Sequence, residues 1–448
     1  LAHYRLTQSI DLSETTWSMA VIPWFGGSFD GNGHVISNLR IRGTERLGLF
    51  GELDSAGSVS HLGLDAVEVS GYGCYVGGLV GDSHGRIAAS FSNGSVRSGR
   101  VLTSLGGLVG SNSGSIAISH SSTAVSRTGR GNDDSLGSND TNSAPGTSSG
   151  SVRVCEEDIG DDHIGGLVGQ NTGSITMSYS SGSVRNVGGD SWPIGLYIGG
   201  LVGDNRGSIV ASHSDSSVMG IGWGGVGGLV GRNYDGSITT SYSSGSVSGT
   251  SSVGGLVGSG SPLNVSACVW DTETSGVSIS AGGVGLTTAE MMDPEMLGLN
   301  GFANDPNWVL DAGRDYPRLA WQGTPGQIIP ELAVDWLAGQ GTVEVPYRID
   351  TADQLILLGK ASILWNRHFV LGADIDLDPT LPGRAVFAHA VIPVFTGVLD
   401  GRGHVISNLR IERGSYVGLF GHLAAEAEVR NVGVVDVNIT NCSYAGGL

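Results

Sequence analysis

The chain has 448 residues, a formal net charge of −19 and 76 glycines, but only 15% charged and 6% aromatic residues. Lys360 is its single lysine, so almost all of the positive charge comes from arginine. An acidic surface repels nucleic acid and anionic membranes, and no apolar run is long enough to cross a bilayer. This composition argues against nucleic-acid binding and membrane insertion, and it is typical of a repetitive scaffold rather than of a compact enzyme.

Two N-terminal blocks recur near the C-terminus. His3–Ser13 (HYRLTQSIDLS) corresponds to His368–Asp378 (HFVLGADIDLD), and Ile22–Ile41 corresponds to Ile392–Ile411, which also ends in GHVISNLRI. The two copies predict a long unit repeated in tandem, of which this sequence is an excerpt. Within the first copy, DGNGH at Asp30–His34 lacks acidic residues at the spacing of a calcium loop, so we expect a plain turn.

A shorter repeat of about 28 residues, such as GGLVGRNYDGSITTSYSSGSVSG at 227–249, fills most of the chain from Leu49 to Leu256. Each copy contains three short apolar or alternating pieces, separated by Gly, Ser, Asn and Asp, which turn a backbone at low cost. We therefore predict an all-β parallel β-helix with about three short strands per coil, whose coils stack at ~4.8 Å. Three recurring positions are expected to fill the core as columns: Leu79, Leu108, Leu167, Leu201, Leu229 and Leu256; Ile87, Ile116, Ile175, Ile209 and Ile238; Val96, Val125, Val184, Val218 and Val247.

Two polar or aromatic positions also recur once per coil. The asparagines at the first are expected to form a hydrogen-bonded ladder, and the rings at the second are expected to stack from coil to coil. The alternative for the rings is an aromatic strip that binds a ligand, whereas a metal site at the histidines is not favoured because neighbouring coils supply rings instead of further ligands. The positions are Asn112, Asn171, Asn205 and Asn233, and Phe91, His120, Tyr179, His213 and Tyr242.

The position after each GLVG or GLFG is the natural place to look for catalytic carboxylates. Glu52 and Asp82 occupy it on adjacent coils, near the ~5 Å separation that retaining glycosidases use. The same column changes charge freely, as a solvated face would, so we favour a surface column over a catalytic pair. Its members are Glu52, Asp82, Ser111, Gln170, Asp204, Arg232 and Ser259.

An insertion interrupts the repeat at Arg127–Asp162 and is expected to be a loop that offers contacts to a partner. Its acidic end, EEDIGDD, could bind calcium weakly, although acidic runs are more often simply solvated. The residues that would bind the ion are Glu156, Glu157, Asp158, Asp161 and Asp162.

The chain contains four cysteines: Cys74, Cys155, Cys268 and Cys442. None belongs to a C-x-x-C motif or has a histidine at zinc spacing, so a structural metal site is not expected and their pairing stays open.

Helical signals occur only after the repeats. Thr287–Leu297 opens with a T-x-x-E capping box, and Thr351–Trp365 opens with T-x-x-Q. In the second segment Leu355, Leu358, Ser362 and Trp365 share one face. We expect both segments to cover open ends of coils, and Gln322–Pro346 to form the junction between units.

The pattern GGLVGxNxGSIxxSYSSGSV closely resembles the bacterial GLUG-motif repeat, which occurs in large surface and secreted proteins. Four further blocks match the unit of that family: Phe29–Ile41, Cys268–Gly276, Gly285–Pro294 and Tyr316–Gln322. The resemblance covers nearly the whole chain. It implies a right-handed parallel β-helix at the cell surface or outside the cell, and it implies no single activity.

These observations divide the chain into three parts: a repeat unit at 1–286, a cap with a junction at 287–345, and the start of a second unit at 346–448. We predict a non-enzymatic extracellular stalk, fibre or sheath with no cofactor, which associates with itself or binds a glycan or host surface. Nucleic acid and membrane insertion are not expected. The alternative is a β-helix that binds or degrades a polysaccharide.

Overall fold

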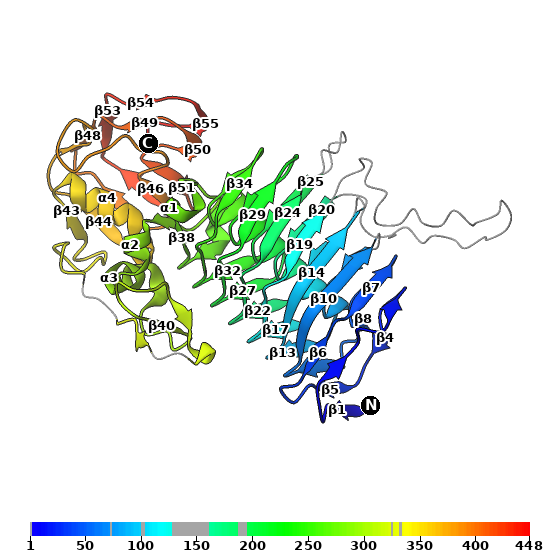
Figure 1. Ribbon diagram of the computed structural model, residues 1–448. Helices are drawn as coiled ribbons and strands as arrows, with labels where there is room; N and C mark the ends of the chain where they lie inside the picture. The colour runs from blue at the N-terminus through cyan, green and yellow to red at the C-terminus, as the bar shows by residue number, and fades with distance from the viewer. Residues whose placement is uncertain are drawn as a thin grey trace. The chain divides into compact units, whose positions relative to one another are not determined.

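The computed structural model describes residues 2–71, 74–99, 104–127, 161–186, 195–323, 326–330 and 334–448 (Figure 1). They divide into two compact units: Leu1–Ser237 with Ser243–Gly260, and Ile238–Tyr242 with Ser261–Leu448. No helix in the described ranges combines the length and apolar character needed to span a membrane.

The first unit is a stack of parallel coils. One coil contains β15 (Ser104–Gly106), β16 (Val109–Asn112), β17 (Ser115–Ala117), β18 (His120–Ser121) and β19 (Ala124–Arg127). The next contains β20 (Asp161–Gly165), β21 (Val168–Asn171), β22 (Ser174–Thr176), β23 (Tyr179–Ser180) and β24 (Ser183–Asn186). Each strand pairs in parallel with its counterpart, as in Ile116↔Ile175 and Val125↔Val184. The predicted parallel β-helix is therefore confirmed.

The strands of this unit form four parallel sheets, which we name A to D. Sheet A contains β1 (His3–Arg5), β5 (Ser28–Asp30), β9 (Ser58–Ser60), β13 (Arg86–Ala88), β17, β22 and β27 (Ser208–Val210). Sheet B contains β2 (Ile10–Asp11), β3 (Thr16–Trp17), β6 (Val35–Ser37), β7 (Arg40–Gly43), β10 (Gly63–Gly71), β14 (Phe91–Ser98), β18, β19, β23, β24, β28 (His213–Ser214), β29 (Ser217–Gly220) and β34 (Val247–Gly249). Sheet C contains β4 (Ile22–Phe25), β8 (Phe50–Leu53), β12 (Val80–Ser83), β16, β21, β26 (Val202–Asn205), β31 (Val230–Asn233) and β36 (Val257–Gly260). Sheet D contains β11 (Tyr75–Val76), β15, β20, β25 (Gly195–Gly199), β30 (Val226–Gly227) and β35 (Val253–Gly254).

A typical coil thus has five short strands and not the three that the sequence predicted. The piece GGLVG is split between sheets D and C, and the S-[FYH]-S piece forms a two-residue strand that is too short to show alternation. The bend before that strand places non-glycine residues in the left-handed region, such as Ile118 with φ 53° and Met177 with φ 47°. A serine ladder follows the bend: the Ser119 hydroxyl donates to Ala117 O, and the Ser178 hydroxyl accepts from Ser119 N.

The core consists of the predicted columns. All residues of the leucine and isoleucine columns are fully buried, and the most exposed member of the valine column, Val247, has 7% of its surface exposed. The last glycine of GLVG is needed for the same packing, because a Cβ on Gly203 would lie 2.5 Å from Ile164 N and 2.8 Å from His163 C. Sheet D therefore packs directly against sheet C, one coil to the next.

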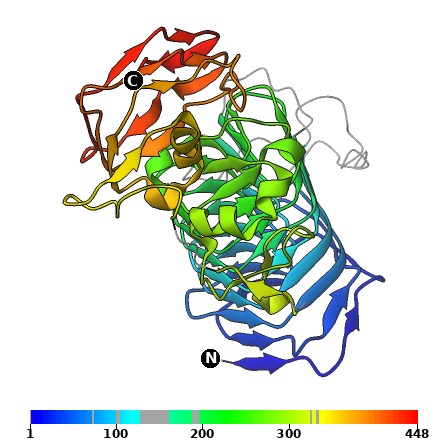
Figure 2. The same cartoon turned by 90° about the vertical axis from the view of Figure 1, so that its left-hand side faces the viewer.

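The second unit contains mostly parallel strands, a three-stranded antiparallel sheet of β40, β41 and β42, and short helices (Figure 2). Two strands, β32 (Ser237–Thr239) and β33 (Tyr242–Ser243), lie where the chain passes from one unit to the other. The helices are η2 (Pro262–Asn264), α1 (Thr272–Ser275), α2 (Thr288–Met291), α3 (Pro294–Leu297), η3 (Gly298–Phe302), η4 (Ala320–Gln322), α4 (Ala352–Lys360) and η5 (Ser362–Leu364). Strands before α4 are β37 (Val265–Ser266), β38 (Val269–Asp271), β39 (Val284–Leu286), β40 (Trp308–Leu310), β41 (Arg318–Leu319), β42 (Gln327–Ile328) and β43 (Tyr347–Ile349). Later strands are β44 (His368–Leu371), β45 (Ile375–Asp376), β46 (Ile392–Phe395), β47 (Val398–Asp400), β48 (Val405–Ser407), β49 (Arg410–Ile411), β50 (Gly414–Val417), β51 (Phe420–Leu423), β52 (Glu428–Arg430), β53 (Gly433–Val435), β54 (Asn438–Ile439) and β55 (Cys442–Ala445).

Both predicted capping boxes are present, at Thr287 with Glu290 and at Thr351 with Gln354. The helices are shorter than the sequence suggested. Asp293 and Pro294 start a new helix inside the first segment, and the second segment leaves helical geometry at Ala361 before continuing as η5. Leu355, Leu358 and Trp365 are nevertheless buried, as the shared face predicted. The DGNGH block forms the expected turn, in which Asp30 accepts a hydrogen bond from Asn32 N.

Candidate functional site

Four of the five predicted rings form a stack on sheet B of the first unit. The ring centroids of Phe91 and His120 are 5.1 Å apart, those of His120 and Tyr179 4.8 Å, and those of Tyr179 and His213 4.9 Å, with interplanar angles of 14° or less. Parallel register places them there, because Phe91 pairs with His120 and His120 with Tyr179. The prediction of stacking is confirmed for these four rings.

The fifth ring packs against further aromatic side chains. Tyr242 lies in the second unit, where its ring packs against Trp308 and Tyr316 and its hydroxyl donates to Pro317 O at 2.7 Å. There it helps to join β33 to the segment around β40 and β41.

Stacking determines what the ring column offers to a ligand. His120 and Tyr179 each have a neighbouring ring on both faces, so only ring edges face outward. Burial lowers the pKa of His120 and lowers that of His213 to about 3, so both imidazoles are neutral at physiological pH. The geometry suits a structural stack, and a ligand-binding role of this column stays a prediction.

The column after GLVG is not the solvated face that the sequence suggested. Asp82 has 6% of its surface exposed and Asp204 has none, because sheet D and its flanking residues cover this part of sheet C. Asp82 pairs in register with Glu52, and Arg46 forms ion pairs with both carboxylates, at 2.7 Å to Glu52 and 3.9 Å to Asp82. Burial raises the pKa of Asp82, against the opposing effects of His84 and Arg46.

The third acidic position of this column, Asp204, is the centre of an ion-pair network. Arg232 Nε donates to Asp204 at 2.7 Å and Arg232 Nη1 to Asp161 at 2.8 Å, and its guanidinium lies 3.7 Å from the centre of the Tyr197 ring. Arg206 donates to the other Asp204 oxygen. Burial alone would raise the pKa of Asp204, but the hydrogen bond from Arg232 and the nearby positive charges lower it. The network joins three coils and leaves no carboxylate poised for catalysis.

The predicted calcium residues are engaged differently. Asp161 and Asp162 belong to β20, not to a loop, and Arg127 likewise belongs to β19. Asp161 pairs with Arg232, and Asp162 forms a buried ion pair with Arg127 at 3.0 Å. Glu156, Glu157 and Asp158 lie outside the described residues. Among the residues that are described, no group of three or more His, Cys, Asp or Glu side chains could hold a metal ion.

The asparagine ladder is the most regular polar feature of the first unit. Asn112, Asn171, Asn205 and Asn233 are fully buried, and each side-chain amide donates to the next side-chain oxygen at 2.8 Å. The same amides also donate to a backbone carbonyl within their own turn. The ladder confirms the prediction and fixes the register of neighbouring coils.

In the second unit, three of the sequence blocks meet at Asp271. Its side chain accepts from the backbone N–H of Glu273 and Thr274, from the Thr288 hydroxyl at 2.7 Å, and from the Tyr316 hydroxyl at 2.6 Å. Burial raises the pKa of Tyr316 to about 12, with the Asp271 charge acting in the same direction. The blocks CVWDTETSG, GLTTAEMMDP and YPRLAWQ therefore assemble one hydrogen-bonded cap.

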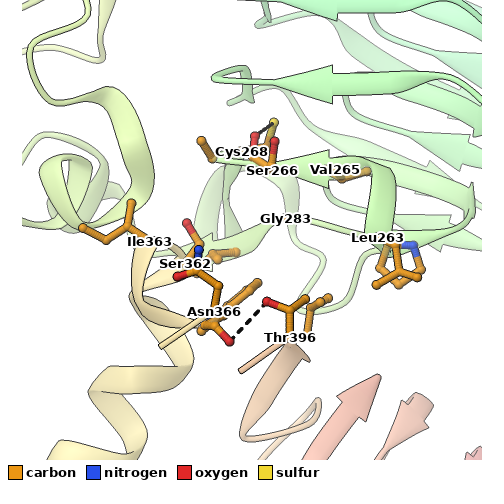
Figure 3. A pocket seen from close by; sticks show the side chains of 14 residues that line it. Leu263, Val265, Ser266, Cys268, Gly283, Ser362, Ile363, Asn366 and Thr396 are labelled. Atoms are coloured by element: carbon orange, nitrogen blue, oxygen red, sulfur yellow. Dashed lines mark hydrogen bonds between the residues drawn. The ribbon is translucent and has the colours of Figure 1, made fainter. Parts of the chain in front are cut away.

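A cavity of about 300 Å³ lies in the second unit (Figure 3). Its walls are largely apolar and include Val265, Val284 and Trp365. Cys268 lines it too, but its thiol donates to Ser266 O, and burial raises the thiol pKa to about 12, so it is a poor nucleophile. No set of charged groups converges on the cavity, and its chemistry indicates no reaction. Of the remaining cysteines, Cys442 is free and Cys74 is disulfide-bonded.

Comparison with known proteins agrees with the repeat architecture. The model of the GLUG motif matches residues 160–185 and 224–248. Halomucin from Haloquadratum walsbyi is 35% identical over 119 residues, which are 24% of this chain and 1% of Halomucin. A protein of Evansella cellulosilytica, provisionally named a Gly-rich membrane protein, is 35% identical over 100 residues, which are 21% of this chain and 12% of that protein. The chain therefore spans only a small part of these relatives.

A crystal structure of a protein from Bacteroides ovatus, provisionally named an immunoglobulin A1 protease, covers 71% of this chain and 86% of that one, with a TM-score of 0.42 and 19% identity. At this similarity the likeness says nothing of activity. The GLUG motif matches on two copies of the repeat, and the other copies stack on them in register with the same glycine, leucine and asparagine positions. The chain therefore carries copies of the GLUG motif, at residues 160–185 and 224–248.

Proposed function

We propose that this chain is a non-enzymatic scaffold segment of an extracellular surface protein, which serves as an adhesive stalk or as the body of a fibre or sheath. The buried asparagine ladder carries the proposal. It joins four coils through side-chain hydrogen bonds of 2.8 Å and has no chemistry of its own. Register locking of this kind makes a stack of coils resist shear, which is what a stalk or fibre requires.

The carboxylates support the same reading. A retaining glycosidase needs one carboxylate as nucleophile and a second as acid and base, both open to the substrate. Asp82 is buried, and Arg46 contacts both Asp82 and its neighbour Glu52. A polysaccharide-degrading β-helix is therefore the weaker alternative.

Three observations support an extracellular location. The matched relatives are named Halomucin and a Gly-rich membrane protein. Cys74 is disulfide-bonded, and disulfides persist mainly in oxidising compartments. The formal charge of −19 favours solubility outside the cell.

Electron microscopy of the purified 448-residue chain at micromolar concentration, with and without Ca²⁺, tests the scaffold role. Separate stiff particles or ordered fibres are expected in both conditions, and incubation with acidic or neutral polysaccharides should leave the polymer length unchanged. Shortening of a polysaccharide by the wild type, abolished in a Glu52→Gln, Asp82→Gln double variant, would replace the scaffold with an enzyme. Stiff particles favour a stalk, and fibres or sheets favour self-assembly as the role.

A further inference from the structure

A line of arginines runs along sheet B of the first unit. Register places Arg42 opposite Ser70, Ser70 opposite Arg97, Arg97 opposite Ser126, and Ser126 opposite Arg185. The strands that present them, β7, β10, β14, β19 and β24, follow one another along the stack of coils (Figure 1). We call Arg42, Arg97 and Arg185 the arginine column.

The column is positively charged and open to solvent. All three arginines are exposed, and their buried neighbours in sequence, such as Val96 and Val184, point into the core. Arg42 shares Glu68 with Arg40, at 3.7 and 3.6 Å, whereas Arg97 and Arg185 have no carboxylate at ion-pair distance among the residues described. The outward positions beside Arg97 and Arg185 are small and uncharged, namely Ser95, Ala124 and Ser183, whereas Arg40 and Glu68 occupy the same positions beside Arg42 and Ser70.

The distance between successive arginines indicates which kind of ligand fits the column. Successive arginines are separated by two coils, and two strand spacings are about 10 Å. A disaccharide of an extended polysaccharide is about as long as that. Arginine pairs with carboxylate and sulfate through two parallel N–H bonds. Ser126, between Arg97 and Arg185, is partly exposed and supplies a hydroxyl for the sugar in between, whereas Ser70 is buried and donates to Ile41 O.

We propose that the arginine column binds a linear acidic polysaccharide that carries one carboxylate or sulfate per disaccharide and lies along the stack of coils. This proposal rests on the proposed function, and it names the class of ligand that an adhesive stalk would bind. Double-stranded nucleic acid fits less well, because each strand places a phosphate every ~3.4 Å of helix axis, far closer than the arginines are spaced. The stacked faces of His120 and Tyr179 also leave no platform for bases on the same sheet.

Hyaluronan, which has one carboxylate per disaccharide, is the probe. Binding of the full 448-residue chain to immobilised hyaluronan is measured by biolayer interferometry. Neutral dextran and polyglutamate serve as comparison ligands. We expect binding to hyaluronan that weakens with salt, little binding to dextran, and weaker binding to polyglutamate, whose charges are more closely spaced. An Arg97→Gln, Arg185→Gln double variant should bind hyaluronan at least tenfold more weakly.

Arg86→Gln is the matched control. Arg86 is exposed on β13 of sheet A, outside the column, and no carboxylate lies at ion-pair distance from it among the described residues. This variant should bind like the wild type, and circular dichroism should be unchanged in all variants. Equal loss in Arg86→Gln, equal binding by the double variant, or no binding of hyaluronan by the wild type would each overturn the proposal. None of these results alters the particles seen by microscopy, so the scaffold role is judged separately.

Discussion

At the scale of single residues, His213, one of the two histidines of the ring stack, makes the fold sensitive to acid. Burial keeps His213 neutral, with a pKa lowered from 6.5 to about 3. The unfolded chain takes up a proton at this residue as the pH falls below about 6.5, whereas the folded chain does not until about pH 3. The free energy of unfolding therefore falls with pH across that window.

Replacing His213 with phenylalanine should remove this contribution and keep a ring in the stack, because Phe91 occupies the same column. The loss of unfolding free energy between pH 7 and pH 4.5 should be smaller in His213→Phe than in the wild type by about 2 kcal/mol. Urea denaturation at the two pH values measures it. An identical loss in both proteins would show that His213 titrates normally.

Asp271, in contrast to His213, is charged in the folded protein. Burial alone would raise its pKa, but the hydrogen bonds from Tyr316 and Thr288 lower it below the usual value. Asp271→Asn keeps the size but replaces one carboxylate oxygen with an NH2 group, which cannot accept, so either the two hydroxyls or the two backbone N–H groups lose their acceptor. We expect a loss of about 2 kcal/mol in the stability of the second unit.

Thermal denaturation of the variant followed by tyrosine and tryptophan fluorescence measures this loss. Asp305→Asn is a suitable control, because Asp305 accepts from a backbone N–H in a turn and touches neither hydroxyl. If Asp271→Asn is as stable as the control variant, the Asp271 carboxylate does not stabilise the second unit as proposed.

At the scale of elements, the asparagine ladder should act cooperatively along the stack. Asn171→Ala removes the acceptor of Asn112 and the donor to Asn205, and it leaves buried polar atoms without their partners. A loss of about 3 kcal/mol is expected. Asn93→Ala removes a single hydrogen bond at an exposed position of β14 and should cost about 1 kcal/mol or less.

Guanidinium denaturation compares the two variants. Similar losses in both would mean that the buried ladder contributes no more than an exposed hydrogen bond, and that register depends on the apolar columns instead.

The side-chain columns of the first unit could be predicted from the sequence, but the number of strands per coil could not. The columns of leucine, isoleucine and valine, the asparagine ladder and the ring stack follow directly from positions that recur once per coil, because parallel register turns sequence period into spatial contact. The count of strands does not follow, since a two-residue strand such as His120–Ser121 has no period of its own. The serine ladder at Ser119 and Ser178 was equally hidden, because serines are frequent throughout the repeat.

Charged positions were harder to interpret for a different reason. The column of Asp82 and Asp204 was expected to be solvated because its charge varies, yet sheet D covers it and each charge is balanced by an arginine from another coil. Such pairing depends on how sheet D packs against sheet C, which no local pattern specifies. The arginine column left a clear trace, the R that follows V in SVRS and SVRN and I in RIRG, but its significance appears only when alternate coils are aligned.

At the scale of the whole molecule, the buried ladders imply that the first unit opens as a cooperative stack and not coil by coil. Strands β16, β21, β26 and β31 carry the asparagines and lie between sheet D and the core. Their amide protons should be protected to a similar degree, because opening any one of them breaks side-chain bonds to both neighbours. A scaffold that bears load depends on this property.

Hydrogen–deuterium exchange of the intact chain, followed by mass spectrometry, tests this most directly. We predict that peptides covering β16, β21, β26 and β31 exchange slowly and together, and that Asn171→Ala speeds exchange in the coils on either side. Rapid exchange of these strands in the wild type, or exchange that differs widely from coil to coil, would contradict a register-locked scaffold.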